Sequence, residues 1–534
     1  MFGIAASLTA ACGDSAVVDP PLADAGAESA SDAQAQCTVA QLRCGDACVD
    51  TASDPKNCGS CGAACLSGDL CCGSKCVQSA SCGFAVTKIE PSHGNQNGGD
   101  WLRITGAGFT ADMSLMIGDG RAPLLVLGPT TAVAQTPPGT VGSYDITIAS
   151  ASGVATTRQG FSYQSAPLAP PWKDVAMNTV RGEHPAVTPL QDGRVLIAGG
   201  TTVPDHPEQA LNTGVLFSRE GASGKVEAPA NAMSTPRWRC SATTLLDGRA
   251  IVVGGPADDP AACVNNTCKL ADLFDPVTNA FTAAKGLMTE SRTFAWSVLM
   301  VDGRVMVTSD GSPTVDLYDP ASDAFTQVAL IKPHYLGQRI VRLRDGRVMV
   351  LGGDGCDGVH PCGPAQADAE LFDPKTGKFT LAAPMKQGRS QFTAHVLPDG
   401  RVLVLGGASI SAGGVHVPLD EIEAYDPKAD TWTVMPYKLS TGRTWHASAL
   451  VRDGTVLVMG GYNHDGKCDV TNTVDVVDPV KAAVSPFDTL TNGNTEWNAV
   501  TMLDGSVVAV GGGACGATQA FPDIYFLPGG PTPN

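Results

Sequence analysis

Residues Leu190–Gly200 read LQDGRVLIAGG, an Asp-Gly pair followed by a short apolar run and two glycines. Asp-Gly beside apolar runs favours a tight β-hairpin, because a type I′ turn needs positive φ at both central residues. Six more stretches of this kind follow at regular intervals, with their Asp-Gly pairs beginning at Asp247, Asp302, Asp345, Asp399, Asp453 and Asp504. Self-similarity at this period indicates a repeat architecture whose units pack side by side.

Two further strands complete most units. In the second unit these are Leu273-Phe274-Asp275-Pro276 and the aromatic segment around Phe281, and six of the seven second strands end in Gly-Gly, with Ser309-Asp310 as the exception. This pattern resembles Kelch repeats, which implies a β-propeller with four strands per blade. The last unit supplies only three strands, ending near 523–527, whereas residues 171–175 resemble a fourth strand without a unit of its own. We therefore expect an all-β chain with a seven-bladed Kelch-type propeller over residues 170–528, closed by its N-terminal strand.

Two smaller domains precede the repeat. Residues 84–164, with the motifs Thr87–Gly94 and Leu102–Phe109, resemble the IPT/TIG family, which implies an immunoglobulin-like sandwich. Residues 37–82 carry ten cysteines, and the spacing from Cys44 to Cys65 resembles the Stig1-like family, which implies an extracellular disulfide module. Disulfides are favoured over zinc because the cysteine count is even and no histidine occurs between residues 1 and 92. Such cysteine density indicates an oxidising compartment.

The N-terminal residues predict export. Residues 1–12 resemble a bacterial signal peptide and lipobox ending at Cys12, the candidate for lipidation, and residues 13–36 have the composition of a disordered tether. The disulfide candidates are Cys37, Cys44, Cys48, Cys58, Cys61, Cys65, Cys71, Cys72, Cys76, Cys82, Cys263, Cys268, Cys356, Cys362, Cys468 and Cys515. Cys240 is left over. We expect an exported protein, lipid-anchored at the outer membrane or cell surface, periplasmic, or secreted.

Composition excludes some partners. The 534 residues carry 35 basic and 53 acidic side chains, a net charge of −18 that is a poor match to a phosphate backbone. We therefore expect no nucleic-acid partner, and contact with a membrane only through the lipid anchor. No cofactor is predicted, although acidic loops containing Asp354, Asp357 and Asp469 leave calcium open. We expect the protein to be a monomer.

The candidate binding residues lie on the propeller face that carries the loops after Gly-Gly. Arg237, Arg292, Arg389 and Arg443 each stand ten residues before an Asp-Gly pair, so they occupy equivalent sites around the axis. Two interpretations stay open: each guanidinium bonds to the backbone of the adjoining blade, or the ring receives an anionic ligand. Trp445 and His446 follow Arg443 directly and are included in the candidate binding set. We expect this face to engage a glycan or a protein.

One enzyme family shares the propeller. Galactose-oxidase-like copper radical oxidases use a cysteine-linked tyrosine and a Tyr-His pair near the axis, and Cys240 and His446 match two of these positions. The two tyrosine positions correspond to Phe294 and Trp445, neither of which supplies a phenolate for copper. The sequence therefore favours an exported binding or adhesion protein without catalytic residues. A propeller enzyme, an oxidase relative or a carbohydrate-active protein, is the alternative.

Overall fold

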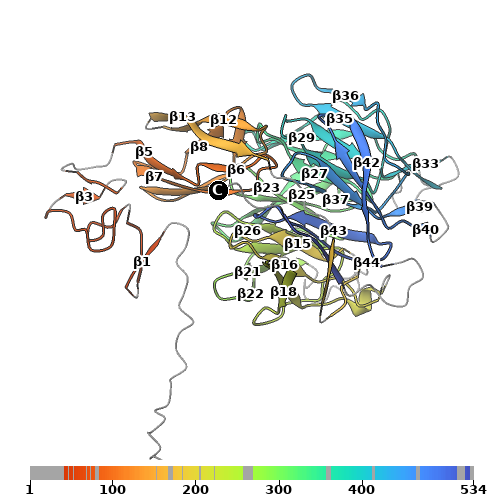
Figure 1. Ribbon diagram of the computed structural model, residues 1–534, viewed down its shortest axis with the longest axis horizontal. Coiled ribbons are helices and arrows are strands. Elements are labelled where there is room, and N and C mark those ends of the chain that lie inside the picture. The colour runs from red at the N-terminus through yellow and green to blue at the C-terminus, as the bar shows by residue number, and fades with distance from the viewer. Residues whose placement is uncertain are drawn as a thin grey trace, which may run out of the picture. The chain divides into compact units, whose positions relative to one another are not determined.

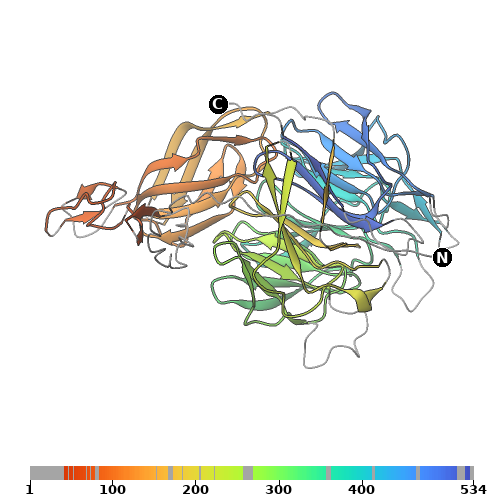
Figure 2. The same ribbon diagram turned by 60° about the horizontal axis from the view of Figure 1, so that its bottom comes forward.

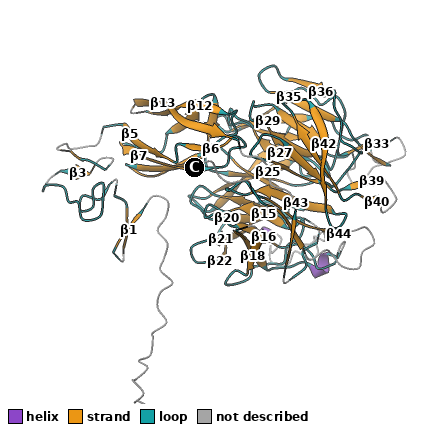
Figure 3. Cartoon of the chain, viewed as in Figure 1, coloured by secondary structure: helices purple, strands orange, loops and turns teal. Residues whose placement is uncertain are grey.

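The computed structural model describes residues 41–45, 47–51, 53–67, 69–71, 74–77, 83–151, 153–165, 172–177, 179–182, 184–203, 206–221, 223–255, 269–355, 363–411, 415–464, 469–513 and 523–529. Contacts divide the chain into residues 1–36 and residues 37–534, and the described residues all belong to the second unit. Nearly all regular structure there is β-strand, and the one helix described is the single 3-10 turn Pro207–Gln209 (Figure 3). Within these residues no helix is both long and apolar enough to span a bilayer.

Seven four-stranded antiparallel sheets form the blades of the predicted propeller, coloured from yellow to blue in Figure 1. Blade 1 consists of β15 (Ala186–Pro189), β16 (Val195–Ala198), β17 (Gly214–Glu220) and β18 (Ser223–Glu227), and blade 2 of β19 (Ser241–Thr244), β20 (Ala250–Val253), β21 (Asp272–Asp275) and β22 (Ala280–Ala283). Blade 3 consists of β23 (Trp296–Leu299), β24 (Val305–Thr308), β25 (Thr314–Asp319) and β26 (Ala324–Ala329), and blade 4 of β27 (Arg339–Arg342), β28 (Val348–Leu351), β29 (Ala369–Asp373) and β30 (Lys378–Leu381). Each blade begins at the innermost strand. The predicted hairpins around Asp-Gly join the first two strands of each blade.

The later blades follow the same plan. Blades 5 and 6 consist of β31 (Thr393–Val396), β32 (Val402–Leu405), β35 (Ile422–Asp426) and β36 (Thr431–Val434); and β37 (Ala447–Leu450), β38 (Val456–Met459), β41 (Thr473–Asp478) and β42 (Ala483–Thr489). Each has a two-stranded insertion after its second strand: β33 (Ala408–Ile410) with β34 (His416–Pro418), and β39 (Tyr462–His464) with β40 (Asp469–Val470).

Blade 7 confirms the predicted closure of the ring. Its three C-terminal strands are β43 (Thr495–Thr501), β44 (Val507–Gly513) and β45 (Asp523–Leu527), and the outermost strand is β14 (Lys173–Ala176) from the start of the propeller. Val175 pairs with Ile524 in an antiparallel register. In both Figure 1 and Figure 2 the yellow first blade lies beside the blue last blade. The closure covers the edge of β45, which the three C-terminal strands alone would leave open.

Apolar second strands and paired aromatic residues hold the blades together. Every side chain of β16, Val195 to Ala198, is 0% exposed, because the strand is covered on both faces by neighbouring blades. The Asp-Pro strand and the aromatic strand place Phe274 against Phe281, with ring centroids 5.1 Å apart. Equivalent aromatic pairs occur in blades 3 to 5. The aromatic residues singled out in the sequence are thus core residues of the propeller.

The Gly-Gly pairs are required by a close approach of two backbones. Gly255 has φ +77°, and a Cβ atom there would lie 2.1 Å from the carbonyl oxygen of Trp238. The N–H of Gly255 in turn donates a hydrogen bond to the Arg292 carbonyl of the next blade. Blade 3 departs from this rule, because Ser309 and Asp310 replace the glycines and neither has positive φ.

Two smaller structures precede the propeller. One is a sandwich of two sheets, with strand orders β10-β11-β7-β5 and β6-β13-β12-β8-β9, around a buried apolar core. Its strands are β5 (Ala85–Glu90), β6 (His93–Asn95), β7 (Trp101–Ala107), β8 (Ser114–Ile117), β9 (Gly120–Ala122), β10 (Leu124–Gly128), β11 (Thr131–Gln135), β12 (Gly142–Ser150) and β13 (Gly153–Gln164). The other has the short hairpins β1 (Leu42–Cys44) with β2 (Ala47–Val49) and β3 (Leu70–Cys71) with β4 (Cys76–Val77).

Disulfides hold the cysteine-rich module, as the sequence predicts. The bonds described are Cys44–Cys61, Cys58–Cys71 and Cys65–Cys76, and Cys48 is also disulfide-bonded. Cys240 is a free, buried thiol. The remaining disulfide candidates lie outside the described residues: Cys37, Cys72, Cys82, Cys263, Cys268, Cys356, Cys362, Cys468 and Cys515. Cys12, the candidate for lipidation, and the segments 1–12 and 13–36 also lie outside them.

Candidate functional site at the propeller axis

A ring of seven residues in the left-handed conformation surrounds the axis of the propeller. Each stands eight residues before the aspartate of its Asp-Gly pair, one per blade: His184, Arg239, Phe294, Gly337, Gln391, Trp445 and Glu496, with φ between +42° and +80°. We call these seven residues the axial ring. Six of them carry side chains, although left-handed backbone costs a non-glycine residue about 1–2 kcal/mol. Backbone strain of this kind is concentrated at binding and catalytic sites.

Backbone hydrogen bonds join consecutive members of the axial ring. The N–H of Gln391 donates to the carbonyl of Gly337, that of Trp445 to Gln391, and that of Glu496 to Trp445. The series continues across the junction of the last and first blades, where the N–H of His184 donates to the Glu496 carbonyl over 2.9 Å. These four bonds couple the backbone conformations of Gly337, Gln391, Trp445, Glu496 and His184 from blade to blade.

Arg239 and Glu496 bring opposite charges to the ring. The guanidinium of Arg239 lies between two aromatic faces, 3.9 Å from the centroid of Trp238 and 4.1 Å from that of Phe294. Its Nη2 is 4.0 Å from Oε2 of Glu496, and both side chains are 15% exposed. The cation–π contacts and the nearby carboxylate stabilise the charge of the Arg239 guanidinium, which has little exposure to solvent. Arg239, Phe294 and His184 line a cavity of about 200 Å³.

His184 is buried between aromatic rings. Its ring lies 5.2 Å from Trp445 and 5.9 Å from Phe294, measured between centroids. Within the described part of the chain neither ring nitrogen has a hydrogen-bond partner, and the side chain lines the same cavity. Burial, followed by the charges of Arg239 and Arg339, holds the pKa of His184 well below its ordinary value. A neutral imidazole with both nitrogens available is thus presented to a ligand in the cavity.

Asp310 supplies a carboxylate beside the one ring position without a side chain. The backbone N–H of Gly337 and the guanidinium of Arg339 face this carboxylate. Burial and the nearby Asp354 raise its pKa well above the ordinary value, against the opposing effect of Arg339. Arg339 itself stacks on Trp296 at 4.0 Å from the centroid. The replacement of Gly-Gly by Ser309-Asp310 was the signal in the sequence for this residue, but it did not lead to a site prediction.

The four predicted arginines lie inside the blades and not in the axial ring. Arg237, Arg292, Arg389 and Arg443 are each 0% exposed, and the carboxylates they contact are Asp272, Asp316, Glu423 and Asp475 on the third strands. Nη1 of Arg237 also donates to the Gly254 carbonyl over 2.9 Å. These contacts agree with the structural interpretation of the arginines. The bonds are made within each arginine's own blade, however, so the expectation of bonds to the adjoining blade was wrong.

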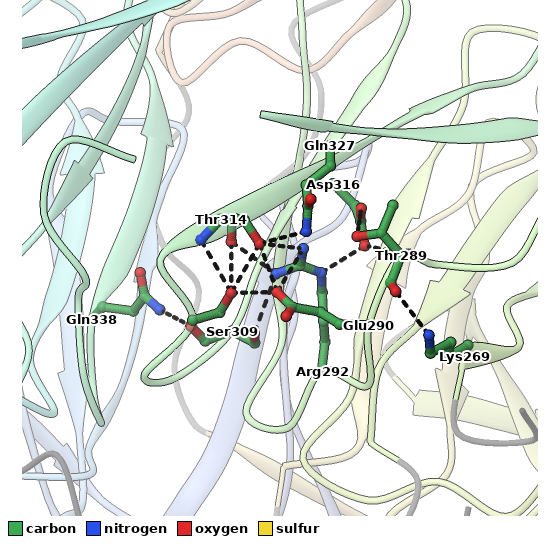
Figure 4. Close-up of polar contacts among 10 residues, drawn as sticks. Lys269, Thr289, Glu290, Arg292, Ser309, Thr314, Asp316, Gln327 and Gln338 are labelled. Carbon is green, nitrogen blue, oxygen red and sulfur yellow. Dashed lines mark hydrogen bonds and ion pairs between the residues drawn. The ribbon is translucent and has the colours of Figure 1, made fainter. Parts of the chain in front are cut away.

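Blade 3 shows the arrangement in detail (Figure 4). Nε of Arg292 donates to Asp316 over 2.7 Å, and Nη1 donates to the Thr314 carbonyl over 2.9 Å. Nε2 of Gln338, from blade 4, donates to the Ser309 carbonyl over 2.6 Å. These bonds satisfy a buried cation and fix the loop that leads to Asp310.

Blades 1 and 4 contain two equivalents that the sequence pattern did not reveal. Arg181 stands eleven residues before its Asp-Gly pair, and its Nη1 donates to the carbonyls of Gly199 and Thr213. In blade 4, His334 takes the place of the arginine, with Nδ1 2.7 Å from the Gly352 carbonyl and Nε2 3.7 Å from Glu370. The one-residue offset and the change of residue type hid both from a search for arginines at fixed spacing.

Trp445 and His446 are both at the axis, but the residues described there are not the copper ligands of a radical oxidase. Trp445 is a ring residue, and Nε2 of His446 lies 2.9 Å from Oγ1 of Thr393. Phe294 and Trp445 occupy the tyrosine positions and carry no oxygen, so neither can bind copper or hold a tyrosyl radical. The buried thiol of Cys240 has no phenol ring to which it could be linked. The residues at these positions do not fit that copper site.

The calcium prediction stays a prediction. Asp354 is 2% exposed and Asp469 is an exposed residue of β40, while Asp357 lies outside the described residues. Among the residues described, Cys58, Cys65 and Cys71 are the only group of three potential metal ligands close enough to share an ion. All three sulfurs are in disulfides, which leaves no thiolate for a metal.

Comparison with known families identifies the parts of the chain. Residues 85–164 match the model of the IPT/TIG domain, and residues 24–92 match that of the stigma-specific STIG1-like protein family. The repeat region is similar to F-box protein AFR of Arabidopsis thaliana (30% identical, covering 22% of this chain and 27% of that protein). It is also similar to Kelch-like protein 25 of Xenopus tropicalis (27%, 28% and 25%) and to alpha-scruin of Limulus polyphemus (26%, 31% and 18%). The chain spans about a quarter of the length of the first two relatives.

A solved structure shares the fold. A fungal alcohol oxidase of the AA5 family, determined in complex with copper, superimposes with a TM-score of 0.51 and 16% identity, over 68% of this chain and 77% of that one. Likeness at this identity shows the fold alone. Sequence and structure together show a seven-bladed β-propeller whose repeats are similar to those of Kelch-repeat proteins, preceded by one segment that matches the IPT/TIG domain and one that matches the STIG1-like family.

Proposed function

We propose that this chain is an exported binding protein that takes one sugar unit of a glycan into the cavity at the axial ring. The single observation that carries the proposal is the ring itself, in which six residues that carry side chains adopt a strained, left-handed backbone around one axis. Strain on this scale persists only where the surrounding structure enforces it, and it favours a ligand site over a purely structural core.

The chemistry of the ring suits a sugar. The flat face of Phe294 can stack on the C–H face of a pyranose, and the imidazole of His184 and the guanidinium of Arg239, which line the same cavity, can bond its hydroxyls. The cavity of about 200 Å³ is lined by both aromatic and polar groups and admits a single ring-sized group. A side chain of a protein ligand is the second candidate, since the same dimensions and chemistry accommodate it.

The disulfides support export. At least three bonds occur within the short described part of the cysteine-rich module, a density typical of domains that fold in an oxidising compartment. We further propose that Cys12 carries a lipid anchor and that the protein acts at the cell surface. Incorporation of a labelled fatty acid into the wild type and its loss in Cys12→Ser would test the anchor separately from binding.

A glycan array with a peptide array as its second arm tests the binding proposal. Phe294→Gly removes a ring side chain that lines the cavity but keeps a residue that adopts the left-handed backbone, as Gly337 already does in blade 4. We expect at least a ten-fold loss of affinity in this variant. Leu381→Ala, at an exposed position of the outer strand of blade 4, is the control and should bind normally. Normal binding by Phe294→Gly would contradict the site, and no ligand on either array would contradict the function.

A further inference from the structure

A second polar site lies on the propeller axis, near the Asp-Gly ends of the innermost strands. A cavity of about 430 Å³ is lined by the innermost strands of all seven blades, and also by Asn97, Gly99, Gln135, Thr136 and Pro138 of the sandwich. The axial ring stands before these strands in sequence, whereas Arg342 is the last residue of β27. Its side chain lines the cavity, so the charge is presented to the channel and not to the axial ring.

Arg342 is a cation with few bonds. Nη1 donates to the Leu299 carbonyl of the neighbouring blade over 2.7 Å, and among the described residues this is the one hydrogen bond that its five donors make. Burial alone lowers the pKa of Arg342 to about 10, so the group stays charged at neutral pH. The buried arginines of the blades, such as Arg389 with Glu423, instead have a carboxylate partner.

The surroundings offer no compensating charge. Of the described residues that line the channel, none is an aspartate or a glutamate. His395 is the other titratable side chain there, and burial lowers its pKa to about 4, so it is neutral at pH 7. Several neighbours are apolar, including Ile340 and Val396. Arg342 is partly exposed to the channel, and a partly buried cation in such surroundings is costly unless a counter-ion or water compensates it.

The hydroxyls at equivalent positions are already used. Thr244 and Thr501 stand, like Arg342, three residues before their Asp-Gly pairs. Oγ1 of Thr244 donates to the Pro189 carbonyl, and Oγ1 of Thr501 donates to the Leu450 carbonyl, both over 2.7 Å. Nη1 of Arg342 therefore repeats a blade-to-blade hydrogen bond that a threonine hydroxyl makes elsewhere. Its Nε–Nη2 edge makes no hydrogen bond to any of the described residues and remains for a ligand. The parallel N–H groups of that edge match the two oxygens of an oxyanion.

We propose that Arg342 binds a small oxyanion, a carboxylate or phosphate group, inside the axial channel. Arg342 does not line the cavity proposed for a sugar, and its ligand chemistry differs, although the two cavities share Ala242, Ser297, Ala499 and Val500 in their linings. The ligand accepts two hydrogen bonds from the Nε–Nη2 edge and supplies the negative charge that the channel wall lacks.

Thermal stability of the full chain at constant ionic strength tests this site, with phosphate, acetate and chloride as separate probes. We expect phosphate and acetate to raise the melting temperature saturably in the wild type and chloride to have a much smaller effect. Arg342→Gln should abolish the shift. Arg347→Gln removes an equal charge from an arginine that pairs with Asp345 at the surface, and it should keep the shift.

Two further results decide the proposal if Arg342→Gln folds poorly. Arg342→Lys keeps the charge but lacks the paired donors, so we expect at least a ten-fold weaker apparent affinity for acetate. A crystal soaked in selenate should show an anomalous peak beside Arg342. Equal shifts with chloride, or a shift that survives in Arg342→Gln, would overturn the proposal, because the guanidinium would then be hydrated only.

Discussion

Replacing Gly255 by alanine tests the physical reason for the Gly-Gly pairs. The new Cβ would lie 2.1 Å from the Trp238 carbonyl oxygen and 2.8 Å from Cβ of Cys240, and φ would remain +77°. The left-handed conformation costs about 1–2 kcal/mol. Relief of the contact with the backbone adds about 1–3 kcal/mol, as overpacking does in other cores. We therefore expect Gly255→Ala to lower the free energy of unfolding of the propeller by about 2–5 kcal/mol.

Two other glycines separate the contributions. Gly193 has φ +89° and open space, with nothing within 4 Å of the point that a Cβ atom would occupy, so Gly193→Ala should cost only the backbone contribution of about 1–2 kcal/mol. Gly363, also in the propeller, has no positive φ, and the nearest atom to its Cβ position is 3.5 Å away, so Gly363→Ala should be neutral or stabilising by up to about 1 kcal/mol. Urea denaturation followed by tryptophan fluorescence ranks the three variants. A Gly255→Ala protein as stable as Gly193→Ala would refute the steric explanation.

The same variant reports on the axial ring. Trp238, whose carbonyl oxygen the new methyl group would displace, also carries the guanidinium of Arg239 on its ring face. A shift of this loop should therefore weaken ligand binding as well as stability. Gly193→Ala changes the Asp-Gly turn of blade 1, between β15 and β16, and should leave binding unchanged.

Three further outcomes are expected. Glu496→Gly should be more stable than Glu496→Ala by about 0.5–1 kcal/mol, because glycine tolerates φ +56°. At Thr433, an exposed residue of an extended strand, the alanine variant should instead be more stable than the glycine variant. Thermal denaturation compares the two variants at each position. Burial raises the pKa of Asp100 to about 6, so the folded state holds this proton more tightly than the unfolded state. The stability of the sandwich should therefore fall as pH rises from about 4 to 6. Denaturation at several pH values should show that the Asp100→Asn variant lacks this dependence. Loss of the Cys44–Cys61 bond in the double serine variant should destabilise the cysteine-rich module by about 3 kcal/mol, seen as faster proteolysis there with an unchanged propeller.

The sequence predicted the propeller because its signals are local and repeated. Asp-Gly turns and Gly-Gly pairs mark backbone conformations that few other residues adopt, so their spacing defines the hairpins. The closing strand β14 was also predicted, since an aromatic strand pattern without its own unit leaves one missing place at the other end. These features depend on backbone geometry that a residue type reveals directly.

The axial ring could not be predicted in the same way. Its members are of seven different residue types, and six of them adopt a conformation for which glycine is the usual signal. Tertiary hydrogen bonds between blades enforce the strain, and no local pattern reports those bonds. The constant offset of eight residues before Asp-Gly becomes meaningful only once the conformation is known. For the four arginines Arg237, Arg292, Arg389 and Arg443 the spacing was regular and indicated equivalent positions in successive blades. The spacing did not show that their hydrogen-bond partners lie within each arginine's own blade.

The pairing of β14 with β45 has a consequence for how the ring is completed. Val175 and Ile524 pair although they come from opposite ends of the propeller sequence, so β14, which is synthesised first, has no partner until β45, the last strand of the propeller, has been synthesised. Until these two strands pair, β45 offers a free edge of the right register to any β14, including that of a second nascent chain. Crowded or slowed refolding should therefore produce dimers that exchange this single strand, with every other blade folded within its own chain.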